Sequence, residues 1–64
     1  MKIVLNGELH RVRAKTLADL LQERGFSGRV ATAVNEEFVP SSLRTSHKLS
    51  DGDRVEVVAP MQGG

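Results

Sequence analysis

The residues of this sequence that are best suited to chemistry are the last two, Gly63 and Gly64. Glycine has no Cβ, so a Gly-Gly end fits a narrow channel and takes backbone angles that other residues avoid. Its carboxylate is unhindered, and chain ends are usually poorly ordered unless they are tied down. Such an end is suited to activation in the active site of another protein. The alternative is a flexible tail without a chemical role, and these residues alone do not decide between the two.

The rest of the chain offers little chemistry of its own. It has no cysteine, which excludes disulfides, thiol catalysis and zinc–thiolate sites. It also lacks a phosphate-binding glycine loop and a cluster of carboxylates that would hold Mg²⁺. His10 and His47 have no nearby acidic or cysteine partners, so we expect both to be solvated and not to bind a metal. The segment 51–53 (Asp-Gly-Asp) lacks the remaining ligands of a calcium loop and is interpreted as a turn.

Length and composition indicate one small domain. A chain of 64 residues buries only about 60% of the surface that its unfolded form exposes, which leaves little room for a deep active site. Aromatic residues are 3% of the chain, so the core must come from aliphatic side chains with Phe26 and Phe38. The net charge of +1 does not indicate nucleic acid binding, and no segment approaches the ~20 apolar residues of a membrane span. We expect a cytoplasmic protein, a monomer when free, that binds neither nucleic acid nor membrane.

The first half of the chain predicts a β-hairpin. Two short strand-like runs, 3–5 and 8–12, are separated by Asn6-Gly7, and Asn-Gly between such runs is the strongest short-range hairpin signal. Leu9 and Val12 are out of phase for strict alternation. We therefore expect the second strand to contain a bulge or to end early.

A helix is predicted next. Thr16 can cap its N-terminus, with Asp19 as a weaker substitute for the usual glutamate of a capping box. Gly25 supplies the C-terminal stop, and Arg24 is placed favourably for the helix dipole. One apolar stripe, expected to pack on a sheet, is formed by Leu17, Leu20 and Leu21.

The second half of the chain predicts three further strands, at 30–34, 38–39 and 54–58. The first of these is continuously small and β-branched, as a strand buried on both faces would be. The segment 41–48 is expected to be a loop or a short 3₁₀ turn with Leu43 as its apolar anchor. The order β-β-α-β-β-β predicts an α+β domain, residues 1–59, with a mixed sheet of four to five strands packed on one helix. Residues 60–64 are expected to be a flexible tail.

Two features are candidates for docking a partner. Phe38 is interpreted first as a core residue, because aromatic side chains bury large areas; exposed on the open face of the sheet with Val57, it would instead anchor a partner. Three basic residues follow the hairpin: Arg11, Arg13 and Lys15. They are interpreted as a solvated strand edge that discourages edge pairing, with docking to an acidic patch as the alternative.

In order and spacing, the landmarks of the whole chain resemble the ThiS family of sulfur carrier proteins, which have the ubiquitin-like β-grasp fold. The landmarks are Asn6-Gly7-Glu8, 16–21 (TLADLL), 30–35 (VATAVN), Val39-Pro40, 52–58 (GDRVEVV) and Gln62-Gly63-Gly64. The resemblance implies a protein that is not an enzyme and that binds no cofactor of its own.

The resemblance also implies a route for the chemistry. A ubiquitin-activating-like adenylyltransferase would use ATP to join the Gly64 carboxylate to AMP. Sulfur from a persulfide donor enzyme would then replace AMP, and the resulting thiocarboxylate would supply sulfur to thiazole synthase in thiamine biosynthesis. Met61, Gln62 and Gly63 would enter the partner's active site with Gly64.

Three alternatives remain open at this point. The same fold serves as the small subunit of molybdopterin synthase, although those chains resemble longer versions of this one. A ubiquitin-like modifier would instead join Gly64 to lysines of target proteins. A β-grasp binding module would carry no terminal chemistry at all.

Overall fold

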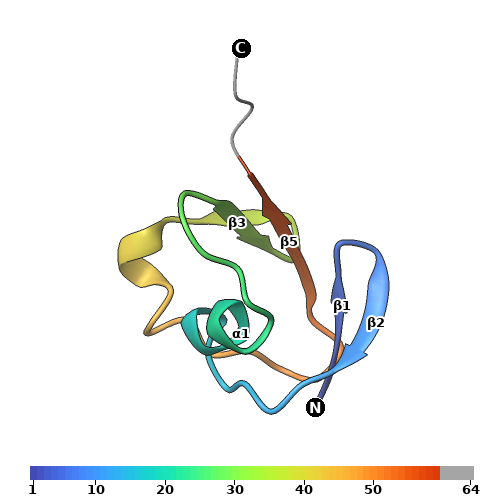
Figure 1. Cartoon of the computed structure of the whole chain (residues 1–64). Helices are drawn as coiled ribbons and strands as arrows, with labels where there is room; N and C mark the ends of the chain where they lie inside the picture. The colour runs from blue at the N-terminus through green and yellow to red at the C-terminus, as the bar shows by residue number, and fades with distance from the viewer. Residues whose placement is uncertain (60–64) are drawn as a thin grey trace.

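The computed structural model describes residues 1–59, and their elements follow the predicted order β-β-α-β-β-β (Figure 1). The elements are β1 (Lys2–Leu5), β2 (Glu8–Arg11), α1 (Leu17–Glu23), β3 (Ala31–Val34), β4 (Glu37–Val39), the 3₁₀ turn η1 (Ser41–Leu43) and β5 (Arg54–Val58). No helix among these residues is both long and apolar enough to span a membrane.

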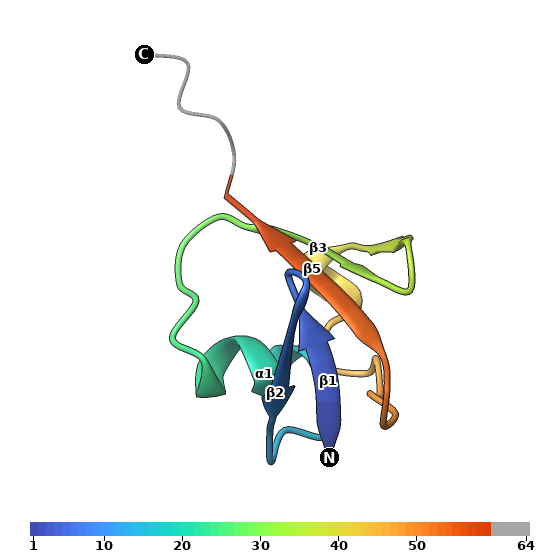
Figure 2. The same cartoon turned by 90° about the vertical axis from the view of Figure 1, so that its right-hand side faces the viewer.

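The five strands form one mixed sheet in the order β2-β1-β5-β3-β4. The last strand of the chain, β5, therefore lies in the centre, parallel to β1 and antiparallel to β3. The two hairpins, β1–β2 and β3–β4, flank it. The single helix packs on one face of the sheet (Figure 2), which gives the predicted arrangement of sheet and helix.

Both hairpins are closed by two residues with positive φ. Asn6 and Gly7 have φ of 49° and 84°, and Asn35 and Glu36 have φ of 52° and 72°, as the mirror-image turns of tight hairpins require. The register of β2 against β1 is continuous, so the expectation of a bulge is wrong. The alternative is confirmed, because β2 ends at Arg11 and the next side chain, Val12, turns into the core.

The start of α1 is capped as predicted. The Thr16 hydroxyl accepts a hydrogen bond from the Asp19 amide at 3.1 Å. Two further amides of the first turn are satisfied by the segment that follows η1: Leu17 donates to the His47 carbonyl and Ala18 to the Arg44 carbonyl. Since the first amides of a helix have no partner within it, this segment completes the cap.

The end of α1 is a Schellman motif. Gly25 has a φ of 77°, its amide donates to the Gln22 carbonyl, and the Phe26 amide donates to the Leu21 carbonyl. The expected stop at Gly25 is confirmed. Arg24 lies one residue beyond the helix, and its guanidinium donates to the Arg11 carbonyl at 2.7 Å at the end of β2.

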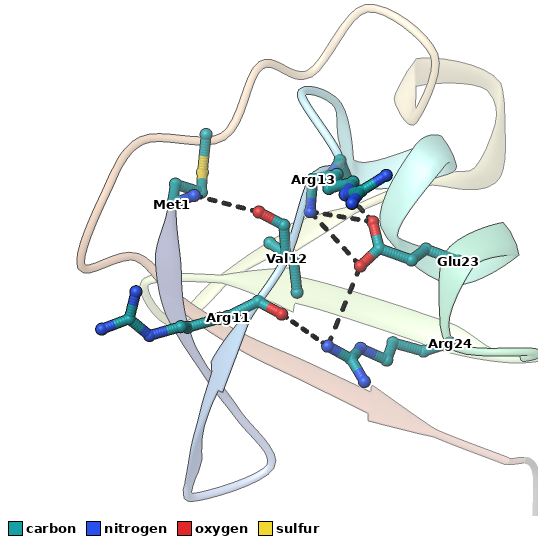
Figure 3. Close-up of polar contacts among 7 residues, drawn as sticks. Met1, Arg11, Val12, Arg13, Glu23 and Arg24 are labelled. Carbon is teal, nitrogen blue, oxygen red and sulfur yellow. Dashed lines mark hydrogen bonds and ion pairs between the residues drawn. The ribbon is translucent and has the colours of Figure 1, made fainter.

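The Glu23 side chain of α1 and the backbone of Met1 hold the connection between β2 and α1 (Figure 3). The Glu23 carboxylate accepts hydrogen bonds from the amides of Arg13 and Ala14, at 3.0 and 2.9 Å from Oε1. The Met1 ammonium donates to the Val12 carbonyl, and the Val12 amide donates to the Met1 carbonyl. This connection thus obtains its hydrogen bonds from segments about ten residues away in the sequence.

The core lies between α1 and one face of the sheet. It contains the predicted leucine stripe of the helix together with aliphatic residues from the strands and the connections: Ile3, Leu5, Val12, Ala14, Leu17, Leu20, Leu21, Val34, Val39, Leu49, Val55 and Val57. Phe26 packs against its margin.

Two expectations about the second half of the chain are wrong. β3 was expected to be buried on both faces, but only Thr32 and Val34 are buried, while Ala31 is exposed. The reason is that, among residues 1–59, one α-helix covers one face of the sheet and no helix covers the other. Leu43 is exposed and does not anchor its segment. Arg44 does so instead, because its guanidinium donates to the Thr32 hydroxyl at 3.0 Å and to the Val30 carbonyl at 2.6 Å.

Candidate functional site

The end of β5 is the part of the described chain that leads to the terminal residues. β5 ends at Val58, and the described residues end at Ala59. On one side, the last residues of the strand pair with β3, where Val58 lies opposite Ala31 and Val57 opposite Thr32. The C-terminal end of β5 is therefore held inside the sheet and not at its edge.

On the other side, a side chain takes the place of the neighbouring strand. The backbone pairing of β1 with β5 reaches only as far as Asn6, whose amide donates to the Val55 carbonyl at 2.9 Å. Beyond that point, Asn6 Oδ1 accepts from the Val57 amide at 2.8 Å and Asn6 Nδ2 donates to the Val57 carbonyl at 3.1 Å. The backbone of Val57 is thus bound through both its groups by one carboxamide.

The sheet face opposite α1 carries exposed apolar side chains. Residues opposite each other on paired strands share a face, so Phe38 shares its face with Ala33, and Val58 shares its face with Ala31. Phe38 is 69% exposed and Val58 is 58% exposed. The primary interpretation of Phe38 as a core residue is wrong: its neighbour Val39 faces the core in its place.

Val57 is not available as a docking residue in this structure. It is 5% exposed and lies in the core, on the opposite face of the sheet from Phe38. The sequence contained a signal for this, because Val55 and Val57 alternate with the charged residues Arg54 and Glu56. The apolar side chain that β5 exposes on the open face is Val58.

A shallow hollow lies beside the end of β5. It has a volume of about 260 Å³ and a mostly apolar lining, formed by Arg29, Val30, Ala31 and Val58. A second hollow of about 190 Å³ lies between the two hairpin turns, and the ion pair of Arg54 and Glu36 at 3.5 Å is part of its lining. These hollows offer contact surface, and their lining residues include no nucleophile.

His10, His47 and the segment 51–53, which the sequence raised as possible metal ligands, lie in β2, in the segment that follows η1 and in a turn, respectively. Nε2 of His10 lies 3.6 Å from a carboxylate oxygen of Glu8, so the expectation that His10 has no acidic neighbour is wrong. His47 is half-buried beside the helix cap. Within residues 1–59, no three acidic or histidine side chains come together as a metal site would require. The turn predicted at 51–53 is confirmed, since Asp51 and Gly52 are turn residues and the Asp53 amide donates to the Ser50 carbonyl at 3.0 Å.

The basic run lies along the exposed edge strand β2 and the connection after it. Arg11, Arg13 and Lys15 are all exposed, and β2 is the outermost strand on its side of the sheet. This position agrees with the interpretation as a solvated edge. The predicted terminal residues Met61, Gln62, Gly63 and Gly64 lie outside the described residues.

Comparison with known proteins gives a consistent result. Residues 3–64 match the model of the ThiS family. The sulfur carrier protein ThiS of Thermus thermophilus is 46% identical over 61 residues, which cover 94% of this chain and 95% of that protein. A thiazole synthase of Paramagnetospirillum magneticum is 42% identical over the whole of this chain, but the matched part is only 20% of that protein.

The structural comparison agrees. The crystal structure of the thiamine biosynthesis protein ThiS from Geobacter metallireducens superposes with a TM-score of 0.86, at 25% identity, over the full length of both chains. A solution structure of a thiamine biosynthesis protein from the same organism has a TM-score of 0.81 and is covered to 88%. The fold is therefore the β-grasp, and the chain belongs to the ThiS family of sulfur carrier proteins.

Proposed function

We propose that this protein carries sulfur as a thiocarboxylate on Gly64 and donates it to the thiazole ring of thiamine. The observation that carries the proposal is the extent of the family match, which runs through the final Gly-Gly pair. The sulfur carrier of Thermus thermophilus, which is covered to 95%, supports the same reading. The central strand β5 ends at Val58, five positions before Gly63 in the sequence.

The proposed chemistry takes place at one carbonyl carbon. The Gly64 carboxylate attacks the α-phosphate of ATP, pyrophosphate leaves, and a mixed anhydride with AMP forms. The terminal sulfur of a persulfide attacks the carbonyl, and the bond to AMP breaks. A second thiol of the donor then cleaves the S–S bond, which leaves the thiocarboxylate on the carrier and a disulfide on the donor.

In this proposal the carrier supplies the reacting carboxylate, and its partners supply the catalytic groups. A carboxylate is a poor acyl donor until it is activated, and stabilising that step requires charged groups arranged around the phosphate. The sequence has no phosphate-binding glycine loop, and without cysteine no side chain can hold a transferable sulfur. We therefore assign adenylation to a ubiquitin-activating-like adenylyltransferase that binds the ATP, and sulfur supply to a separate persulfide enzyme.

The thiazole synthase relative supports thiazole synthase as the enzyme that receives the sulfur. Part of a thiazole synthase is 42% identical to the whole of this chain, so the two kinds of domain occur in one polypeptide. A carrier and the enzyme that consumes its sulfur must meet in each cycle, and covalent linkage raises their effective concentration. We propose that this chain meets thiazole synthase through the exposed Val58 at the end of β5 and the residues after it.

Intact mass measurement of the protein from its native cell tests the proposal. A thiocarboxylate changes the mass by the replacement of one oxygen by sulfur, and the fragment that carries it must end in Gly64. A variant without Gly64 and a variant lengthened by one alanine serve as controls, since neither has the reacting carbonyl in place. Persistence of the sulfur in either variant, a natural reading frame that continues past Gly64, or isopeptide-linked adducts would each refute the proposal.

A further inference from the structure

The parallel pairing of β1 with β5 extends one step further than the backbone of β1 does. The successive bonds on this side are Val4 N–H to the Asp53 carbonyl, Asn6 N–H to the Val55 carbonyl, and then the Asn6 carboxamide to both backbone groups of Val57. At Asn6 the chain turns into the hairpin, with a φ of 49°. The side chain continues the ladder at the point where the main chain has left it.

Without this side chain, one edge of β5 would lose its partner just before the strand ends. Val57 is the last residue but one of β5, and its amide and carbonyl both point toward the β1 side. Partly buried backbone groups without a partner cost free energy comparable to a lost hydrogen bond. Strand ends that lack partners open locally more often than the rest of a domain.

We propose that Asn6 is a positioning residue that fixes the exit of β5 for the partner that acts on the terminus. The proposal rests on the proposed function, because it assumes that the residues after β5 are the substrate. With both backbone groups of Val57 bound by Asn6 and with Val58 paired to β3, the strand keeps its partners on both sides up to its end. A partner then binds a preorganised exit and does not have to order it, which lowers the cost of binding.

The structure offers a closely matched control at the other end of the same strand. Asn35 also lies in a hairpin turn with positive φ, and its Oδ1 accepts from the Arg54 amide at 3.0 Å, where β5 begins. The test variants are Asn6→Gly and Asn35→Gly. Glycine accepts positive φ without strain, so each variant removes a carboxamide from β5 while keeping the turn. Both also add the same freedom to the unfolded chain.

Amide hydrogen exchange measures the positioning directly. In Asn6→Gly, we expect the Val57 amide to exchange about tenfold faster than in Asn35→Gly, after correction for global stability, because one hydrogen bond is lost at that amide. The amide of Thr32 in β3 should exchange equally in the two variants. Equal Val57 exchange rates in the two variants would overturn the inference.

Kinetics of the adenylation step test the functional part. We expect Asn6→Gly to raise the KM for the carrier about threefold to tenfold, with kcat within about twofold of wild type, because ordering is then completed on binding. Asn35→Gly should leave both constants at the wild-type values. Equal KM values for the two variants would refute a role in positioning. If the wild-type protein is not adenylated at all, the proposed function itself fails and this inference fails with it, whatever the exchange rates are.

Discussion

Glu23 is the residue whose replacement most directly tests how this small domain is held together. Its Oε1 accepts from the amides of Arg13 and Ala14 at 3.0 and 2.9 Å, and Oε2 lies 3.3 Å from the Arg13 amide. The second oxygen also lies 3.8 Å from the Arg24 guanidinium. Replacing Glu23 by alanine removes the acceptor of two backbone amides in the connection between β2 and α1.

The cost of this replacement follows from the geometry. A hydrogen bond to a charged group contributes about 1.5–3 kcal/mol when it is shielded from water. The Glu23 side chain is 30% exposed, so in the variant water can partly replace the carboxylate as acceptor. We therefore assign a loss of about 1 kcal/mol to each of the two amide hydrogen bonds. The expected loss is about 2 kcal/mol, against a total of about 3–10 kcal/mol for a domain of this length. The melting temperature should therefore fall by about 8–16 °C.

Thermal and urea unfolding followed by circular dichroism measure this loss. Gln22→Ala is the matched control, because Gln22 is an exposed neighbour on the same helix turn and both variants gain the helix propensity of alanine. Glu23→Gln keeps an oxygen acceptor and should lose less than half as much. The contact with Arg24 is partly exposed and contributes little, so 1 M salt should not remove the difference. If Glu23→Ala had the same melting temperature as Gln22→Ala, the Glu23 carboxylate would not stabilise the connection between β2 and α1.

Two further predictions concern the two faces of the sheet. Leu20→Ala should lower the free energy of unfolding by about 2–5 kcal/mol, because Leu20 is fully buried. If this variant unfolded at the same urea concentration as the wild type, α1 would pack differently from the structure. Phe38→Ala should change stability by less than about 1 kcal/mol, because Phe38 is 69% exposed. If the open face docks the adenylyltransferase, the same variant should weaken binding measured by calorimetry, and unchanged affinity would exclude Phe38 from the interface.

The features that the sequence predicts well are those whose signal and structure lie within a few residues. Asn6-Gly7 needs only the conformational preferences of two residues to make a tight hairpin turn. The Thr16 hydroxyl caps an amide three residues away, and Gly25 ends the helix with bonds inside the last turn. Because these devices are local, no knowledge of the rest of the fold was necessary to place them.

The face that a strand buries is harder to predict when the strand is short. Phe38 and Val39 are both apolar and adjacent, so either can face the core, and size favoured the wrong one. The choice is made by the partner strand: Val39 lies opposite Thr32, which is buried, and Phe38 lies opposite Ala33 on the open face. The error at β3 has the same origin, because a continuous apolar run does not reveal that only one face has a helix.

Long-range bonds between side chains and the backbone left no readable trace in the sequence. Glu23 and Arg24 look like ordinary residues at the end of a helix, yet they bind backbone groups 9 to 13 residues away. Arg44 lies in a polar segment and holds the Val30 carbonyl, 14 residues away. Many arginines and glutamates would satisfy the same local pattern, so only the folded arrangement identifies these three.

The central position of β5 has a consequence for a carrier that works through its terminus. Each residue released from the end of a strand lengthens the free segment by about 3.3–3.6 Å, while a misplacement of about 1 Å at a reacting centre can cost a large part of the rate. Under the proposed function, a partner that binds the domain and acts at Gly64 therefore needs the strand to end at the same residue in every molecule. An edge strand has one free side and would fray. β5 is paired with β3 as far as Val58, and Asn6 binds the backbone of Val57 on the other side. The side chains of Val55 and Val57 are also buried in the core. These contacts fix the residue at which the strand ends.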